Sequence, residues 1–385
     1  MKWIIPVLLL SIVPVKFLSA QSDNDGIRIF RKHSGPVKAL SFSTDGEVLA
    51  TGGDDKTIYF WNMKSDEVTG TVKNFFNIKA LEFTPDNLIL AACGSDIKLM
   101  DMQGKLKRTF SGYTTDIWSM DYNASAHKVI AGSYAKSIKV WNYDNASVLF
   151  TLTGHEKSCL PVDMNAAGDM AVSGSLDKSV RLWDLKKGEQ IKKLEIHSEN
   201  IFAVDFHPSG KYVLSASADK TIRLWNLETG SVVRTYSGHN AGIFDVRFSP
   251  DGNCFLSGSA DKTIILWETA TGKILNTFTG HGAYVNEVRF SPDGRSFASA
   301  SDDQTVRIWN LEKKYFVDAY FEKEIDEARQ ASPLFAPRKP EESKQAYASR
   351  ELEAKKFLDG LYDQYYEKYL QLPGLSDPEG FQKHQ

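Results

Sequence analysis

Residues 215–226 read SASADKTIRLWN, and closely related stretches recur along the chain. Clear copies are TGGDDKTIYFWN (51–62), SGSLDKSVRLWD (173–184), SGSADKTIILWE (257–268) and SASDDQTVRIWN (299–310). Two weaker copies keep the spacing, LAACGSDIKLMD (90–101) and AGSYAKSIKVWN (131–142). The aromatic or Met position of each copy follows that of the copy before it by 39 to 42 residues, at Trp61, Met100, Trp141, Trp183, Trp225, Trp267 and Trp309. This near-constant period indicates a repeat architecture.

Each repeat has the pattern of a small antiparallel sheet. In residues 243–281, short runs rich in β-forming residues alternate with the turn signals Pro-Asp-Gly, Ala-Asp-Lys and Thr-Gly-Lys, and this predicts four strands. A sheet of roughly 40 residues cannot bury both of its faces alone, whereas sheets packed radially bury them against one another. Seven copies therefore predict an all-β fold, a seven-bladed β-propeller.

The repeats also resemble a known family. Gly154-His155 precedes Trp183-Asp184, Gly238-His239 precedes Trp267, and Gly280-His281 precedes Trp309-Asn310. His33 and His197 keep the His without the preceding Gly. This Gly-His to Trp-Asp or Trp-Asn arrangement resembles the WD-repeat (WD40) propellers over residues 27–311.

Five of the repeats carry a His, a Ser or Thr, and an Asp at fixed distances before the Trp. The sets are His33, Thr51, Asp55 and Trp61; His155, Ser173, Asp177 and Trp183; His197, Ser215, Asp219 and Trp225; His239, Ser257, Asp261 and Trp267; His281, Ser299, Asp303 and Trp309. The remaining two copies lose all three polar residues together, with Leu90 and Gly94 in one and Tyr113, Ala131 and Ala135 in the other. Such joint loss indicates a linked hydrogen-bonded unit. An enzyme needs one nucleophile, so five equivalent sets argue against a catalytic triad, and the resemblance implies structural tetrads.

Two segments compete for the outer strand that closes the ring. Residues 27–33, IRIFRKH, match the outer strand before His281, whereas YFVDAYF (315–321) follows Trp309 at the outer-strand offset. Closure by the N-terminal segment would join both chain ends and remove an open edge. We favour it, with the propeller spanning 27–321, and YFVDAYF would then cover the edge or begin a helix.

Beyond the propeller, the pattern predicts a short C-terminal α-helical extension. Three Pro and mixed charge predict a linker over 322–342. Helix formers over 343–372, with an apolar stripe, predict an amphipathic helix. The stripe residues are Ala354, Leu358, Leu361, Tyr365, Tyr369 and Leu372. Docking on the propeller is the expected use of this helix, and 373–385 would be a flexible tail.

A partner would bind where the inner strands end around the channel. The resemblance implies two recurring positions at that entrance. They hold Lys38, Lys79, Trp118, Leu160, Phe202, Phe244 and Asn286, and Asp54, Cys93, Tyr134, Leu176, Ala218, Ala260 and Asp302. The aromatic residues would form a binding hot spot, with the two lysines and the nearby Asp54 and Asp302 as a polar rim, or they would plug the channel as packing.

The N-terminus has the layout of a secretory signal peptide. One Lys, an apolar run over 4–15 and small residues at Ser19 and Ala20 predict a signal over 1–20, with cleavage after Ala20 or Ser22. The chain would then be exported to the periplasm, the exterior or a secretory lumen, or stay tethered by an uncleaved segment. Cys93, Cys159 and Cys254 lack metal spacing and are expected to be buried. Asn123-Ala-Ser and Asn145-Ala-Ser fit the N-glycosylation pattern.

These patterns predict an exported, non-catalytic scaffold that binds one or more proteins or peptides. Alternatives are glycan or small-molecule binding at the aromatic mouth, and an enzyme built from propeller loops. The formal net charge of −3 does not suggest nucleic acid. No cofactor motif, metal motif or catalytic set is evident, and no stable membrane insertion is expected once a signal is cleaved.

Overall fold

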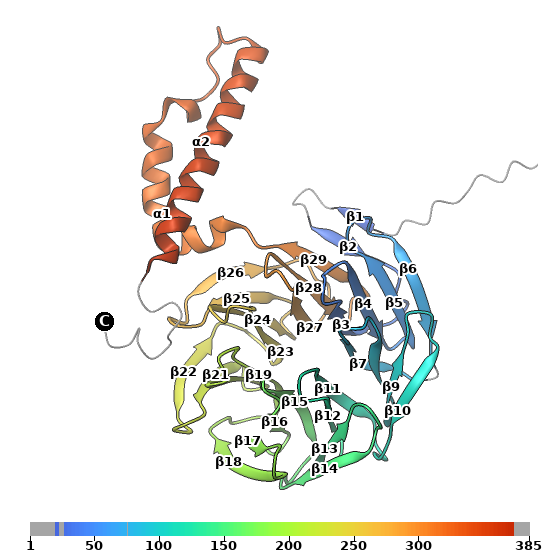
Figure 1. Ribbon diagram of the computed structural model, residues 1–385. Coiled ribbons are helices and arrows are strands. Elements are labelled where there is room, and N and C mark those ends of the chain that lie inside the picture. The colour runs from blue at the N-terminus through green and yellow to red at the C-terminus, as the bar shows by residue number, and fades with distance from the viewer. Residues whose placement is uncertain (1–19, 23–26, 75, 373–385) are drawn as a thin grey trace, which may run out of the picture.

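The computed structural model describes residues 20–22, 27–74 and 76–372. Its main body is a ring of antiparallel four-stranded blades, with two helices beside the ring (Figure 1). The inner strands β3, β7, β11, β15, β19, β23 and β27 surround the ring axis, and successive inner strands contact one another. Seven blades account for the strands β2 to β29.

Blades 1 to 4 follow one another along the chain, each running from the inner to the outer strand. Blade 1 is β3 (Val37–Phe42), β4 (Val48–Gly53), β5 (Thr57–Asn62) and β6 (Val68–Lys73); blade 2 is β7 (Ile78–Phe83), β8 (Ile89–Cys93), β9 (Asp96–Met100) and β10 (Leu106–Phe110). Blade 3 is β11 (Ile117–Asn123), β12 (Lys128–Ser133), β13 (Ser137–Asn142) and β14 (Val148–Thr153); blade 4 is β15 (Cys159–Met164), β16 (Met170–Ser175), β17 (Ser179–Asp184) and β18 (Glu189–Glu195). One bridge between Ser133 and Cys159 joins blades 3 and 4 into a single sheet.

The last blade combines strands from both ends of the chain. Blade 5 is β19 (Ile201–Phe206), β20 (Tyr212–Ser217), β21 (Thr221–Asn226) and β22 (Val232–Ser237); blade 6 is β23 (Ile243–Phe248), β24 (Cys254–Ser259), β25 (Ile264–Glu268) and β26 (Ile274–Phe278). Blade 7 is β27 (Val285–Phe290), β28 (Ser296–Ser301), β29 (Val306–Asn310) and the N-terminal β2 (Arg28–Phe30), with β1 (Ala20–Ser22) outside it. Because β2 pairs with β29, the N-terminal segment closes the ring.

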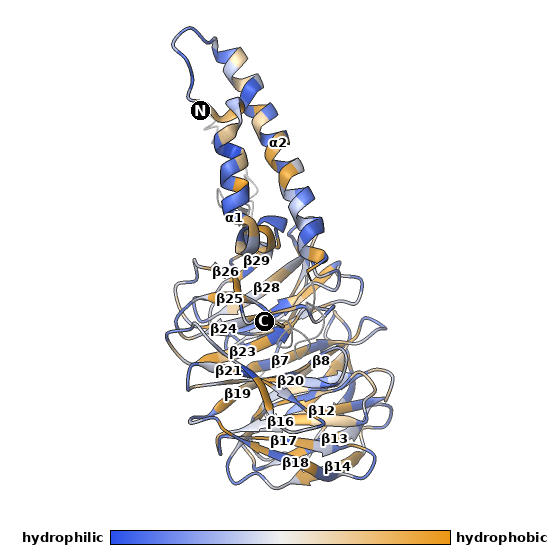
Figure 2. Cartoon of the chain, turned by 90° about the vertical axis from the view of Figure 1, so that its left-hand side faces the viewer, coloured by the Kyte–Doolittle hydropathy of each residue, from blue (hydrophilic) through white to orange (hydrophobic). Residues whose placement is uncertain are grey.

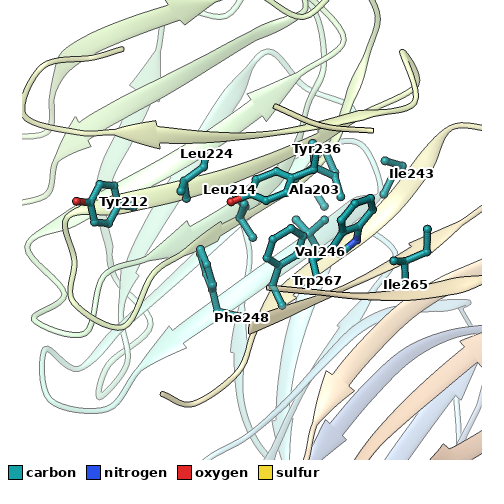
Figure 3. Packing of buried hydrophobic residues seen from close by; sticks show 13 residues of the cluster. Ala203, Tyr212, Leu214, Leu224, Tyr236, Ile243, Val246, Phe248, Ile265 and Trp267 are labelled. Carbon is teal, nitrogen blue, oxygen red and sulfur yellow. The ribbon is translucent and has the colours of Figure 1, made fainter. Parts of the chain in front are cut away.

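The hydrophobic core lies between neighbouring blades. In the cluster that joins blades 5 and 6, Leu214 and Leu224 face Val246 and Trp267 (Figure 3). Trp225 of blade 5 packs on Val172 and Leu182 of blade 4 in the same way. Each blade therefore buries its faces only because it has two neighbours, which is why the ring must close.

The C-terminal region forms a helical hairpin that projects from the edge of the ring (Figure 2). Its helices are α1 (Lys313–Ala331), which is kinked at Phe321, and α2 (Lys344–Leu370), with a 3₁₀ turn at Pro333–Phe335 between them. The extension of the propeller through residue 321 was wrong, because its last strand ends at Asn310. The linker predicted over 322–342 was wrong for 322–331, where helix formers continue α1 until Pro333.

Helix α2 lies within the predicted range 343–372, and its apolar stripe packs mainly on α1 rather than on the propeller. Phe321 contacts Tyr365, and Phe316 contacts Tyr366 and Tyr369. None of the helices among the described residues is both long and apolar enough to cross a membrane. Of the signal predicted over 1–20, residues 1–19 lie outside the described residues, and so does the tail predicted over 373–385.

Candidate functional site

A cavity of about 270 Å³ opens at one mouth of the central channel. Its walls come from the first residues of the inner strands, because successive blades bring these positions together around the axis. Six of the seven residues predicted to bind a partner line it, namely Lys38, Lys79, Trp118, Phe202, Phe244 and Asn286. The seventh, Tyr134, is half exposed and packs edge-on against Trp118, with ring centroids 5.8 Å apart.

One side of this mouth is an aromatic arc. The centroids of the Phe202 and Phe244 rings are 5.4 Å apart, and those of Phe244 and Tyr284 are 5.8 Å apart. Trp118 lines the same cavity from blade 3. We define the aromatic arc as Trp118, Tyr134, Phe202, Phe244 and Tyr284. Tyr284 is 48% exposed. It was not predicted from the sequence because it lies in the loop before the inner strand. An aromatic residue in that loop was the available signal.

The opposite side carries ion pairs. Lys38 Nζ lies 2.5 Å from Asp302 Oδ1 and donates to Asn286 Oδ1 at 3.2 Å. Asn286 Nδ2 in turn donates to Asp302 Oδ1 at 2.8 Å. Lys79 Nζ pairs with Asp54 Oδ1 at 2.8 Å on the neighbouring blade. The lysines at the rim are thus already neutralised by carboxylates of the same chain.

Deeper in the channel, two arginines bridge several carboxylates. Arg289 Nε lies 3.0 Å from Glu287 and its Nη2 lies 3.1 Å from Glu82. Arg247 lies 3.3 Å from Asp205 and 3.4 Å from Asp245. Both arginines also line a second cavity, of about 410 Å³, at the opposite mouth.

Channel carboxylates also fasten five of the blades to the next blade around the ring. Asp121 accepts the N–H of Met164, Asp163 that of Phe206, Asp205 that of Phe248, Asp245 that of Val288 and Glu287 that of Leu40, at 2.7–3.0 Å. Burial raises the pKa of Asp205 to about 6 and that of Glu287 to about 7. Burial, together with the charges of Asp121 and Asp205, raises the pKa of Asp163 well above its usual range. The carboxylates have structural partners, so nothing marks them as a reaction centre.

The five polar tetrads lie inside the blades, away from the mouth. In blade 5, the Nδ1 of His197 is 2.8 Å from Asp219, and its Nε2 is 2.8 Å from Ser215 Oγ, which also accepts the indole N–H of Trp225 at 2.8 Å. The other four sets have the same arrangement, with corresponding distances of 2.7–3.0 Å. Ser215 is fully buried, so a substrate cannot reach this hydroxyl. The geometry is that of a structural network.

The two departing blades replace the tetrad in different ways. In blade 3, the Tyr113 hydroxyl donates to Ala131 O at 2.7 Å and accepts the N–H of Lys139, while Trp141 donates to Ser111 O. In blade 2, Met100 stands in place of the Trp and has no N–H to satisfy. Both substitutions keep the interior groups paired without a His-Asp couple.

The repeats match a known domain model, WD domain, G-beta repeat, over 25–62, 104–142, 146–184, 188–226, 230–268 and 272–310, which is more than half of the chain. The chain belongs to the WD40-repeat family. The matched ranges leave out most of blade 2 of this WD40 propeller, which is one of the two blades without a tetrad.

Several curated WD40-repeat proteins are similar to part of this chain. Transcriptional corepressor LEUNIG_HOMOLOG of Arabidopsis thaliana is 30% identical over 134 residues, which cover 33% of this chain and 17% of that protein. Striatin-3 of Homo sapiens is 27% identical over 146 residues, covering 38% and 15%. Autophagy-related protein 16 of Arabidopsis thaliana is 27% identical over 128 residues, covering 31% and 25%. The matches span at most a quarter of each of these relatives.

One further feature distinguishes blade 6 of this WD40 chain. The Trp-Asp or Trp-Asn position holds Glu268, which is fully buried. Its carboxylate accepts hydrogen bonds from Tyr369 Oη at 3.0 Å, from Tyr320 Oη and from Thr271 Oγ1. Asn226 at the same position of blade 5 instead accepts backbone N–H groups of its own turn. The longer Glu268 side chain therefore anchors the helical hairpin to the ring.

Proposed function

We propose that this WD40-repeat protein is an exported, non-catalytic scaffold that binds a protein or peptide at the mouth lined by the aromatic arc. WD repeats and their relatives support an interaction scaffold in general. The observation that carries the specific proposal is the cavity beside Trp118, Phe202, Phe244 and Tyr284. Half-exposed aromatic rings around a concave site are typical of binding hot spots.

The charges at this mouth support a partner that contributes an apolar anchor. Lys38 and Lys79 are each paired with a carboxylate of the chain. An incoming charged group would have to break such a pair, at a cost in desolvation and lost contacts. An apolar side chain that fills the cavity meets no such competition and buries aromatic surface.

Export is supported by the N-terminal pattern and is consistent with the thiols. The three cysteines are unpaired and buried, and burial raises the pKa of Cys93 and of Cys254 to about 12. Such thiols expose no thiolate to an oxidising compartment. N-terminal sequencing of the mature protein tests export directly: a start at Gln21 or Asp23 supports cleavage, and an intact Met1 in all cell fractions contradicts it.

Binding is tested with a double substitution of the aromatic arc. Immobilised wild-type protein, F202A/F244A and the control I274A, whose exposed residue lies on the outer strand β26, are compared as baits. We expect a partner that is retained at high salt by the wild type and I274A, and lost with F202A/F244A. Equal retention by all three would exclude this mouth. Binding of the wild type to a glycan array instead, with binding lost in the variants Trp118→Ala and Phe244→Ala, would mean that the rings stack on sugars.

A further inference from the structure

Two sequence triplets fit the N-glycosylation pattern, and the structure separates them. Asn145-Ala146-Ser147 lies in the turn between β13 and β14, where Asn145 and Ser147 are both exposed. Asn123-Ala124-Ser125 lies at the end of β11, where Asn123 is 9% exposed. The same local pattern therefore occurs in two opposite environments.

The amide of Asn123 is committed to the fold. Its Nδ2 donates to Asn165 O at 2.9 Å and to Ala166 O at 3.1 Å, both in the following blade. Its Oδ1 accepts the N–H of Ala126 at 2.8 Å. A sugar on Nδ2 would remove at least one of these donors and would have to occupy the space between blades 3 and 4. A chain modified at this position could not complete that contact.

The amide of Asn145 is available. Its Oδ1 accepts the N–H of Ser147 at 2.9 Å in an Asx turn, and this fixes the Ser next to the Asn. Its Nδ2 donates no hydrogen bond to any residue in the described ranges, and the turn is exposed. A large polar group on Nδ2 would extend into solvent without displacing a contact.

We propose that Asn145, and not Asn123, is an N-glycosylation site of the folded protein when the chain passes through a glycosylating secretory pathway; this rests on the proposed export. The co-reactant is a lipid-linked oligosaccharide pyrophosphate. Nδ2 forms a bond to the anomeric carbon, the bond from that carbon to the phosphate oxygen breaks, the lipid pyrophosphate leaves with the electron pair, and Nδ2 loses one proton.

The test expresses the full chain in eukaryotic secretory cells, once with its own N-terminus and once with a proven leader in place of residues 1–22. The folded, protease-resistant product is treated with peptide N-glycosidase and weighed. We expect one glycan on the wild type and on S125A, and none on S147A or N145Q. The serines changed are both exposed members of their triplets, so S125A is the matched control.

Three results would overturn the site: a glycan that persists in S147A and N145Q, a glycan that S125A removes, or none on the folded, leader-swapped wild type. If the leader-swapped chain is modified at Asn145 but the chain with its own N-terminus is not, the export proposal fails and the site stands. The two proposals can therefore fail separately.

Discussion

The hydroxyl of Tyr369 donates a 3.0 Å hydrogen bond to Oε1 of Glu268, which joins the end of α2 to blade 6 across 101 residues of sequence. Tyr320 of α1 donates to the other oxygen of the same carboxylate. Tyr320 and Tyr369 also contact each other, with ring centroids 5.7 Å apart. One buried side chain thus holds both helices at the base of the hairpin.

Shortening this side chain should release the hairpin while the blade stays folded. Asp is the residue at this turn position in blade 4, so E268D suits the turn, but its carboxylate should not reach both tyrosines. We expect E268D to lower the free energy of unfolding by about 1–3 kcal/mol, since the hydroxyl donors lose a charged acceptor. We also expect faster hydrogen exchange in α1 and α2. The control E228D changes an exposed Glu in the turn between β21 and β22 of blade 5. Unchanged exchange in E268D would refute the anchoring role.

The tetrads should contribute stability rather than catalysis. S215A leaves the Nε2 of His197 and the indole N–H of Trp225 without their shared partner. We expect S215A to lower the free energy of unfolding by about 1–3 kcal/mol, which is measured as a lower midpoint of unfolding in urea. S231A, at an exposed position in the turn before β22, is the control and should change the midpoint little. An S215A protein as stable as the wild type would contradict the network.

The sequence predicts those features of the molecule whose residue pattern recurs in several blades. The tetrad around Trp225 was predictable because its spacing recurs in five blades, so one chain supplied its own comparison. Closure by β2 was favoured because Phe30 precedes His33 as Phe278 precedes His281. Helix α1 was only partly anticipated: YFVDAYF was expected either to cover the edge or to begin a helix, and the Pro residues beyond it suggested a linker over the rest of α1.

The site was predictable only where it follows the repeat. Phe202 and Phe244 occupy a recurring strand position, and the resemblance to WD40 propellers implied that this position lies at the mouth. Tyr284 lies in a loop outside that register. Glu268 reads locally as drift from the Trp-Asn pattern, and its role depends on Tyr320 and Tyr369, far away in sequence. Contacts of this kind leave no periodic signal.

Removing the charge of Asp163 should stabilise the protein in a pH-dependent way. Its pKa is raised in the folded state, so folding binds a proton, and the associated stability is present at low pH and lost as pH rises above about 4. D163N keeps an oxygen for the N–H of Phe206 but carries no charge. We expect D163N to have a higher free energy of unfolding than the wild type near pH 8, because the buried Asp163 carboxyl is costly to ionise in the folded state.

This advantage should shrink as the pH falls toward 5. Thermal melts of both proteins at several pH values measure it. An advantage that is constant with pH, or that grows on acidification, would show that the carboxylate is not held in its protonated form by burial. D169N, at a partly exposed Asp that pairs with Lys186, is a control that should show no gain near pH 8.

The aromatic arc should matter less for folding than the blade core does. Leu214 is fully buried between blades 5 and 6, and L214A should lower the free energy of unfolding by about 2–5 kcal/mol. Phe202 and Phe244 are half-buried beside a cavity, so F202A/F244A should cost clearly less and remain folded by circular dichroism. Failure of the double variant to fold would mean that these rings are packing for the channel.

The most direct measurement places a photo-cross-linker at the mouth. p-Benzoylphenylalanine replaces Tyr284, and in a control it replaces Ile274 on the outer strand of blade 6. After irradiation in extract of the source cells, we predict one protein adduct at position 284. Excess wild-type protein, added as a competitor, should suppress this adduct, whereas excess F202A/F244A should not. Adducts of equal yield at both positions, or equal suppression by both competitors, would contradict binding at the aromatic arc.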